Sequence, residues 1–294
     1  MRQTWKMLKN KIKLTGVLGY PIKHSLSPAM HNAAFKHSKL NYAYLPFKVK
    51  PEECAGLIKL LPELGFTGVN ITVPHKQTAY RTVDFLTKDA RLSGAVNTIK
   101  VKNNKLYGTS TDGEGLFRSL NQDAGINIKG KNIIILGAGG AGRSAAVYLA
   151  VKGAKRIIVA NRSKKKALFA VKLIKKYAPR VTAISVPLDE NIIKSYSFTS
   201  DLIINATSLG LNKSDKPAIG KKAFKRGIIF YDMIYNPALT STMKVAKRAG
   251  ARVYGGIGML LHQGALSWEI WTGKKAPIRI MKKALIRGLK KKKK

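Results

Sequence analysis

The chain has 294 residues, 45% of them hydrophobic, and its 55 lysines and arginines against 14 acidic residues give a formal net charge of +41. This length allows two globular domains of about 100–200 residues each, and the single cysteine, Cys54, excludes an intramolecular disulfide. No window reaches the roughly 18 apolar residues of a membrane-spanning helix, and the basic N-terminal stretch lacks the apolar core of an export signal. We therefore expect a folded, cytoplasmic protein.

The positive charge raises the hypothesis of a nucleic-acid or acidic-membrane partner, because neutralising phosphates drives binding that does not depend on sequence. Lysines are spread over nearly every predicted helix, however, and no nucleic-acid-binding motif or paired metal-ligand spacing accompanies them. We expect no specific nucleic acid, no membrane, no metal and only adventitious polyanion binding. The lysine run that ends at Lys294 is interpreted as a solvated end.

In the first part of the chain, strand-like and helix-like patterns alternate, which favours an α/β fold with parallel strands covered by helices. Ser27 and Pro28 are typical of the N-cap and the first position of a helix. Asn103 and Asn104 form a turn-type pair between two short strands. The predicted elements are strand 14–20, helix 27–40, strand 42–49, helix 52–64, strand 68–73, helix 74–86 and a hairpin over 97–110.

The pattern restarts near residue 112 with a helix over about 113–124, and the last helix is expected to begin near Gly258. Between them the sequence predicts a six-stranded nucleotide-binding sheet. We therefore predict a substrate-binding domain over 1–112, completed by 258–294, and a Rossmann-type domain over 113–257, with a cleft separating them. The elements recognised in the second domain include strands 156–161, 201–207, 227–233 and 252–256 and helix 163–178.

A dinucleotide site is predicted by Gly137, Gly139 and Gly142, a GxGxxG pattern that directly follows a strand and opens a helix. The glycines allow a tight turn and a close approach of backbone N–H groups to a pyrophosphate. The next strand ends in "NRSKKK", with Asn161 and Arg162 where an NAD enzyme has an acidic residue. A guanidinium holds a 2′-phosphate that a carboxylate repels, so NADP is the predicted cofactor.

Lys76 is unusual because the strand pattern of "VNITVPHKQ" leads through a proline into a cation at an expected helix start. The positive end of the helix dipole and partial burial disfavour the charged form of a lysine there, whereas a nearby carboxylate favours it. Such a lysine can exchange a proton with an alcohol or ketone. Taken alone, a lysine at this position is more often a solvated residue at a helix start than a catalytic one. Its neighbour His75 points about 100° away on a helix and is expected on the surface or a cleft wall.

Nine segments in order resemble the shikimate dehydrogenase family over about residues 12 to 288. They are "GYPIKHSLSPAMHN", "GVNITVPHK", "SGAVNT", "TDGEG", "GAGGAGRSA", "NRS", "DLIINATSLG", "YDMIYNP" and "GIGMLLHQGA". The resemblance implies an NADP-dependent oxidoreductase that reversibly reduces 3-dehydroshikimate to shikimate in chorismate and aromatic amino acid biosynthesis. It also implies that Lys76 is the catalytic lysine and that Asp112 is its carboxylate partner and a substrate contact.

Further positions follow from the same resemblance. Ser25 and Ser27 match residues that bind the substrate carboxylate, and Thr72 and Asn97 match residues that hold ring hydroxyls. Tyr235 and Gln263 match further substrate contacts. The positions that match NADP-lining residues are Gly137, Ala138, Gly139, Gly140, Ala141, Gly142, Asn161, Arg162, Ser163, Lys166, Met233 and Gly256.

Two other functions remain open at this point. A quinate/shikimate dehydrogenase of the same fold would accept an extra ring hydroxyl and could use NAD, whereas a non-catalytic NADP-binding regulatory or RNA-associated protein would have lost the reaction. Arg162 favours the NADP enzyme over the first alternative, and the presence of both Lys76 and Asp112 argues against the second. A monomer or a homodimer is expected.

Overall fold

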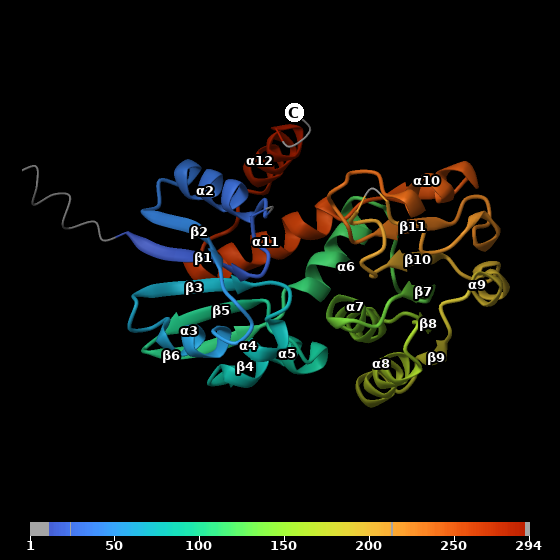
Figure 1. The fold of residues 1–294 in the computed structure, drawn as a ribbon, viewed down its shortest axis with the longest axis horizontal. Helices are drawn as coiled ribbons and strands as arrows, with labels where there is room; N and C mark the ends of the chain where they lie inside the picture. The colour runs from blue at the N-terminus through green and yellow to red at the C-terminus, as the bar shows by residue number, and fades with distance from the viewer. Residues whose placement is uncertain (1–11, 24, 213, 292–294) are drawn as a thin grey trace, which may run out of the picture. The chain divides into compact units, whose positions relative to one another are not determined.

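The structure, a computed structural model, describes residues 12–23, 25–212 and 214–291 (Figure 1). The predictions made for the N-terminal stretch and for the end of the lysine run lie outside these residues. The chain forms two α/β units, each with a six-stranded sheet. The first unit comprises the residues up to Thr111 and those from Gln263 onward, and the second comprises Asp112–His262.

The sheet of the first unit has the strand order β2-β1-β3-β5-β6-β4. Strand β1 pairs in parallel with β2 and β3, whereas β5 is antiparallel to both β3 and β6. Strands β5 and β6 form the hairpin predicted around Asn103 and Asn104, and both asparagines have positive φ angles. The strands are β1 (Lys13–Gly19), β2 (Tyr42–Lys48), β3 (Phe66–Ile71), β4 (Phe85–Leu86), β5 (Thr98–Lys102) and β6 (Lys105–Thr109).

Helices pack on this sheet over a core that includes Leu18, Val69 and Ile99, all fully or almost fully buried. Figure 1 shows α2 beside α12 and shows α3 and α4 together, as their mutual contacts require. The helices of this unit are α2 (Ser27–His37), α3 (Cys54–Leu60), α4 (Lys76–Thr82), α5 (Lys88–Ser93), α12 (Ile278–Lys291) and the part of α11 (Ile257–Thr272) from Gln263 onward.

Two local predictions for the first unit are wrong. The N-cap of α2 is Leu26 rather than Ser27, and the Ser25 hydroxyl oxygen accepts the Ser27 N–H at 3.3 Å. The predicted helix 74–86 is shorter, because the backbone becomes extended at Val83 and pairs with β6 as strand β4. The Asp84 carboxylate holds this turn by accepting the Leu106 N–H at 2.7 Å.

The second unit has the all-parallel strand order β12-β11-β10-β7-β8-β9, the doubly wound order of dinucleotide-binding folds. Its strands are β7 (Asn132–Leu136), β8 (Arg156–Ala160), β9 (Thr182–Val186), β10 (Leu202–Asn205), β11 (Ile229–Asp232) and β12 (Arg252–Tyr254). Isoleucine-rich strands such as β7 are buried on both faces, as parallel strands require.

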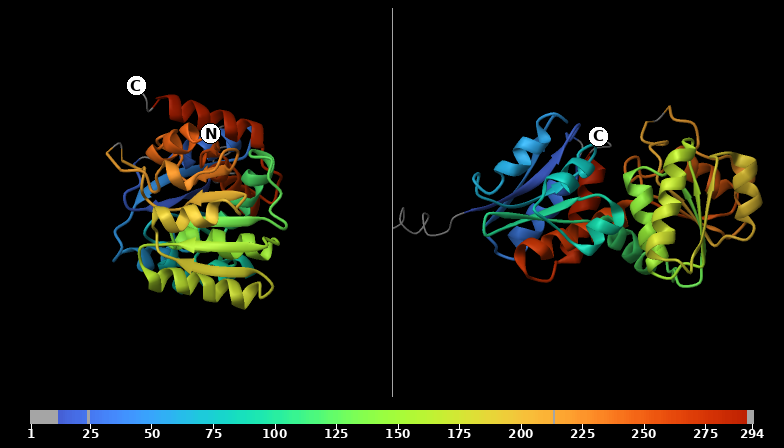
Figure 2. Two further views of the ribbon diagram at one scale, coloured as in Figure 1. Left: turned by 90° about the vertical axis from the view of Figure 1, so that its right-hand side faces the viewer. Right: turned by 90° about the horizontal axis from the view of Figure 1, so that it is seen from below.

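Helices cover both faces of this sheet, and Figure 2 shows α7 and α8 on one face and α9 on the other. The helices are α6 (Asp112–Gln122), α7 (Gly140–Val151), α8 (Lys164–Tyr177), α9 (Glu190–Ser197) and α10 (Ser241–Arg248), with a 3-10 turn at Lys221–Ala223. Strand β9 and helices α9 and α10 were not predicted. Strand β9 is only partly buried, so it lacks the continuous apolar run of the inner strands. Within the described residues, no helix has the length and apolarity needed to cross a membrane.

Candidate active site

Asn97 is the centre of a buried polar network in the first unit, at the end of the loop that enters β5. Its side-chain oxygen accepts the backbone N–H of Thr111 at 2.8 Å. Its amide nitrogen donates to the Thr111 hydroxyl at 2.9 Å and to the Gln263 side-chain oxygen at 3.4 Å. The structure therefore joins two predicted substrate contacts, Asn97 and Gln263, that lie 166 positions apart in the chain.

A second polar layer supports Asn97 from within the sheet. The side-chain amide of Asn70 donates to the backbone carbonyl of Asn97 at 3.1 Å, to the Thr98 hydroxyl at 3.0 Å and to the Ser267 hydroxyl at 2.9 Å. Tyr44 donates its hydroxyl to the Asn70 side-chain oxygen at 2.7 Å. Buried polar groups with all these partners hold a single geometry. Sequence reasoning missed these residues, although Asn70 interrupts an otherwise apolar strand and is a signal of this kind.

Lys76 is the first residue of α4, and the backbone on either side of it is fixed. Its carbonyl accepts the Val96 N–H at 3.0 Å, which ties the first turn of α4 to the residue that precedes Asn97. The N-cap residue His75 is buried, and its Nε2 lies 2.9 Å from the Val49 carbonyl oxygen. Of the two expected positions for His75, the surface and a cleft wall, the surface is wrong, because the ring is buried and anchors α4 to the loop between β2 and α3.

The other predicted substrate residues of this unit lie at the carboxyl ends of β1 and β3. Thr72 follows β3, donates its N–H to the Leu18 carbonyl at 2.9 Å and accepts the His75 N–H at 2.9 Å. Ser25 and Ser27 lie in the segment between β1 and the first turn of α2. The carboxyl ends of parallel strands are where open α/β sheets bind ligands.

In the second unit, Asp112 begins α6 and is buried, and the contact between α6 and α7 lies next to it. A Cβ on Gly113 would lie 2.5 Å from the Tyr148 ring, so only glycine allows the two helices this approach. Glu114 accepts hydrogen bonds from the Tyr148 hydroxyl and from Arg118 Nε, and the Lys152 ammonium lies 3.5 Å from it. This cluster fixes the helix that carries Asp112.

The Glu114 cluster makes stability depend on acid pH. Burial by itself raises the pKa of Glu114, but the hydrogen bonds from Tyr148 and Arg118 and the charge of Lys152 outweigh it and lower the pKa. A lowered pKa contributes stability above the unfolded-state value of about 4.3, and the contribution is lost as pH falls through the folded-state value. At about pH 6 we expect the unmodified protein to have a higher free energy of unfolding in urea than Glu114→Gln. This difference should shrink as the pH is lowered to about 3.

Glu52 provides the control for this expectation, because its side chain is exposed. Glu52→Gln should change the unfolding free energy little, and by the same amount, at both pH values. If the difference in unfolding free energy between the unmodified protein and Glu114→Gln is the same at both pH values, these contacts cannot be assigned to an ionised Glu114.

The glycine turn follows β7 at the point where strand order reverses. Gly137 has a φ of +99°, and a Cβ there would lie 2.9 Å from the Ala206 backbone. A Cβ on Gly142 would lie 2.0 Å from the Gly137 carbonyl oxygen. By contrast, nothing lies within 4 Å of a Cβ built on Gly139 or Gly140. The turn thus leaves space in front of the first amides of α7, where a phosphate fits and the helix dipole favours it.

The segment after β8 lies against this turn. The Asn161 side-chain oxygen accepts the Ala138 N–H at 3.0 Å, and its amide donates to the Ser163 carbonyl at 3.0 Å. Ser163 caps α8, and its hydroxyl oxygen accepts the Lys166 N–H at 3.5 Å. The Arg162 side chain is exposed. Asn161 therefore couples the glycine turn to the segment that follows β8, where Arg162 is one of several exposed cations.

Met233 and Gly256 are brought together at the ends of β11 and β12. A Cβ on Gly256 would lie 2.0 Å from the Met233 carbonyl oxygen, so this contact requires glycine. Asp232 is fully buried and accepts the Thr240 hydroxyl at 2.7 Å and the Ile234 N–H at 3.0 Å. Burial raises the pKa of Tyr235, which follows this turn. These residues lie at the carboxyl edge of the sheet, the same edge as the glycine turn.

Comparison with known proteins gives the same family for each part of the chain. Residues 17–99 match the family described as shikimate dehydrogenase substrate binding domain, residues 119–233 match shikimate / quinate 5-dehydrogenase, and residues 256–286 match shikimate 5'-dehydrogenase C-terminal domain. A relative from Methanopyrus kandleri, shikimate dehydrogenase (NADP(+)), is 40% identical over 94% of this chain and 96% of its own length.

Solved structures agree. A crystal structure of shikimate dehydrogenase in complex with NADP+ has a TM-score of 0.87 and 40% identity, covering 95% of this chain and 96% of that one. The Thermus thermophilus enzyme in complex with NADP(H) and shikimate has a TM-score of 0.84 and 33% identity, covering 94% and 100%. The matches extend over both units and include the segments that carry the polar network and the glycine turn. The chain therefore belongs to the shikimate dehydrogenase family.

Proposed function

We propose that Lys76 and Asp112 are the proton-transfer pair of this enzyme, an NADP-dependent shikimate dehydrogenase that interconverts 3-dehydroshikimate and shikimate. The observation that carries the proposal is the hydrogen bond from the Val96 N–H to the Lys76 carbonyl, which fixes Lys76 beside the buried network around Asn97. A lysine held at a helix start next to a preorganised set of amide and hydroxyl groups suits acid–base chemistry on an alcohol.

The chemistry assigned to these side chains is simple. When bound, NADPH supplies a hydride to the ketone carbon. The Lys76 ammonium donates a proton to the oxygen that becomes the hydroxyl, and its positive charge stabilises that oxygen as negative charge develops. Asp112 is the carboxylate partner of Lys76 in this proposal. In the reverse direction, Lys76 accepts the hydroxyl proton of shikimate.

The substrate is held by the hydroxyl and amide groups of the first unit in this proposal. Ser25 and Ser27 bind its carboxylate, and Thr72, Asn97 and Gln263 bind its ring hydroxyls, with Tyr235 and Asp112 as further contacts. The side-chain amide of Asn97 is already oriented by Thr111, whose hydroxyl accepts from it and whose N–H donates to it, so little ordering is left for substrate binding to impose. Neutral donors suit a monocarboxylate with several hydroxyl groups.

Ser25→Ala provides a test of the carboxylate site. Loss of one hydrogen bond to a charged group costs about 1.5–3 kcal/mol, so the KM for shikimate should rise about 10-fold or more while kcat changes little. The Ser25 hydroxyl already accepts the Ser27 N–H, so thermal unfolding must show that α2 remains intact. A normal KM in a folded Ser25→Ala variant would remove Ser25 from the substrate site.

The residues of the glycine turn fit NADP. The open space at Gly139 and Gly140 accepts the pyrophosphate, and Arg162 with Ser163 and Lys166 is assigned to the 2′-phosphate. Ala138, Ala141, Gly142 and Asn161 shape the turn, and Met233 and Gly256 line the opposite wall.

An absorbance assay at 340 nm with shikimate or quinate, each with NADP+ or NAD+, tests the activity and its rivals. We expect the highest kcat/KM with shikimate and NADP+. A higher value with quinate, or with NAD+, would favour the quinate/shikimate alternative. Absence of turnover in all four combinations would favour a non-catalytic NADP-binding protein. We further propose a cytoplasmic monomer or homodimer with no specific nucleic-acid partner.

A further inference from the structure

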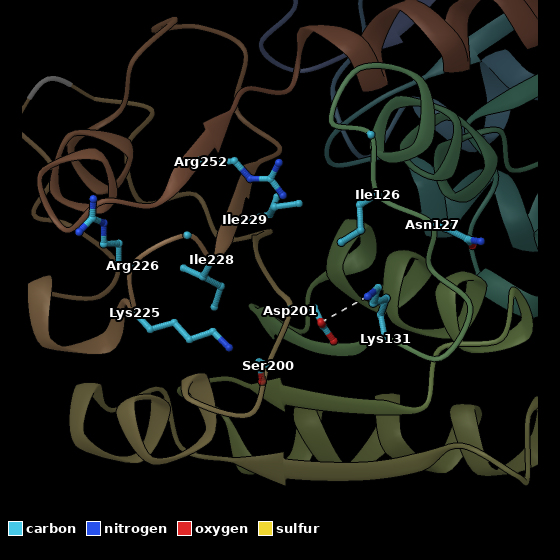
Figure 3. Close-up of a pocket in the computed structure, with 12 residues that line it drawn as sticks. Ile126, Asn127, Lys131, Ser200, Asp201, Lys225, Arg226, Ile228, Ile229 and Arg252 are labelled. Atoms are coloured by element: carbon cyan, nitrogen blue, oxygen red, sulfur yellow. Dashed lines mark ion pairs between the residues drawn. The ribbon is translucent and has the colours of Figure 1, made fainter.

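A hollow of about 500 Å³ opens at the amino ends of the strands of the second unit (Figure 3). We call it the amino-end hollow, and it is lined by residues 125–127, 131, 200, 201, 225–229 and 252. These residues include or directly precede the first residues of β7, β10, β11 and β12. The glycine turn follows the carboxyl end of β7, so the hollow and the nucleotide site lie at opposite edges of one sheet.

Three cationic side chains extend toward the amino-end hollow from different sides. Figure 3 shows Arg252, Lys225 and Lys131 arranged around it, each from a different loop or strand start. Asp201 is the one carboxylate among the described lining residues, and its Oδ1 lies 3.5 Å from the Lys131 ammonium. The positive charges of these three side chains therefore outnumber the single negative charge of Asp201.

The remaining two cations have no carboxylate partner in the described part of the chain. Lys225 donates one N–H to the Phe198 carbonyl at 3.0 Å, which leaves its other two donors for a ligand. Arg252 offers a planar guanidinium that binds a carboxylate or a phosphate through two N–H groups at once. Like charges that converge on a concave surface attract an anion more strongly than the same charges spread over a convex one.

The inner wall of the hollow indicates what the rest of the ligand looks like. Ile126, Ile228 and Ile229 line it and are at most 5% exposed. No aromatic side chain is among the described lining residues, so a nucleotide base would have no ring on which to stack. We propose that the amino-end hollow binds a small aliphatic molecule that carries two or more carboxylate or phosphate groups.

Inorganic pyrophosphate and citrate are suitable probes, because they present phosphate and carboxylate groups separately. Calorimetric titration is performed on enzyme saturated with NADP+, which fills the glycine turn, at about 150 mM salt to screen diffuse charge effects. We expect saturable binding of at least one probe at one site per chain. The probe that binds identifies the anionic group. Absence of saturable binding with both probes overturns the proposal.

Matched double variants separate this site from the general charge of the protein. Lys225→Gln with Arg252→Gln should weaken binding at least about 10-fold. Lys222→Gln with Arg248→Gln removes the same charge and should change binding less than about 2-fold, because both side chains are exposed in the same unit and neither lines the hollow. Equal weakening in both variants overturns the proposal.

A gain of binding excludes misfolding as the explanation. Asp201→Asn keeps an oxygen that can accept the Asn132 N–H but removes the negative charge that faces Lys131. Its affinity for the bound probe should rise about 3-fold or more, because an anion in the site no longer meets a like charge. Unchanged or weaker binding in a folded Asp201→Asn variant contradicts a site built from these cations.

Discussion

Lys76→Met is expected to lower kcat for shikimate oxidation by about 10²- to 10⁴-fold, the range that positioned acid–base groups contribute, with a much smaller change in KM. Methionine keeps an unbranched chain of similar length but can neither carry a proton nor stabilise a developing alkoxide. The backbone contacts of residue 76, including the bond from Val96, do not depend on the side chain, so α4 should stay in place. Steady-state kinetics at 340 nm measures the effect.

Lys88→Met is the matched control for this variant. Lys88 is the first residue of α5, as Lys76 is of α4, and its side chain is exposed in the same unit. Its replacement removes the same charge from the same kind of helix position and should leave kcat within about 2-fold. Near-normal kcat for Lys76→Met, or an equal loss in both variants, would refute a proton-transfer role for Lys76.

Arg162→Asp is expected to reduce the preference for NADPH over NADH, expressed as the ratio of kcat/KM values, by at least about 100-fold. A charge-assisted hydrogen bond contributes about 1.5–3 kcal/mol, and the introduced carboxylate also repels the 2′-phosphate while it accepts the ribose hydroxyls of NADH. Asn161 holds the adjoining turn through Ala138, so the change at the exposed neighbouring position should not alter the glycine turn.

Arg180→Asp controls for the net charge of the protein. Arg180 is exposed after the end of α8 and lies in the same unit, so its replacement makes the same change in charge away from the glycine turn. The cofactor preference of this variant should stay within about 2-fold of the unmodified chain, because exposed charges are screened over about 8–10 Å. If Arg162→Asp and Arg180→Asp reduce the preference for NADPH over NADH equally, the net charge of the protein, rather than contact with Arg162, selects the 2′-phosphate.

The sequence predicted best where the signal is local. The glycine turn and the hairpin at Asn103 and Asn104 each depend on residues within a few positions, and both have the expected structure. The buried strands of the second unit were recognised because parallel strands covered on both faces are continuously apolar. The roles assigned to the site residues stay predictions that the kinetic experiments address.

Prediction failed where tertiary contacts override local preference. The stretch 74–86 resembles one helix, yet pairing with β6 and the Asp84 carboxylate make its end a strand. Ser27 has the sequence position of a cap, but the bend before α2 uses Leu26 and Ser25 instead. In both cases the local sequence permits the expected structure. The contacts that prevent it come from strand β6 in the first case and from the turn before α2 in the second.

The polar support of the site could not be predicted for a related reason. The Asn70 amide bonds to Ser267, which is 197 positions away, and no periodicity connects the two. The sequence offers only the observation that polar side chains such as Asn70 and Thr98 stand in buried strands, where an unpaired polar group is costly. The resemblance to the family identifies the contacts with substrate more readily than the residues that orient them.

A double-mutant cycle on Lys76 and Asp112 tests the central claim most directly. The kcat of Lys76→Met, of Asp112→Asn and of the double variant is compared with that of the unmodified enzyme, with shikimate and NADP+ saturating. If the two residues act as one pair, Asp112→Asn costs about 10-fold or more alone and little once Lys76 is methionine. Fold-losses that multiply in the double variant would contradict a paired role.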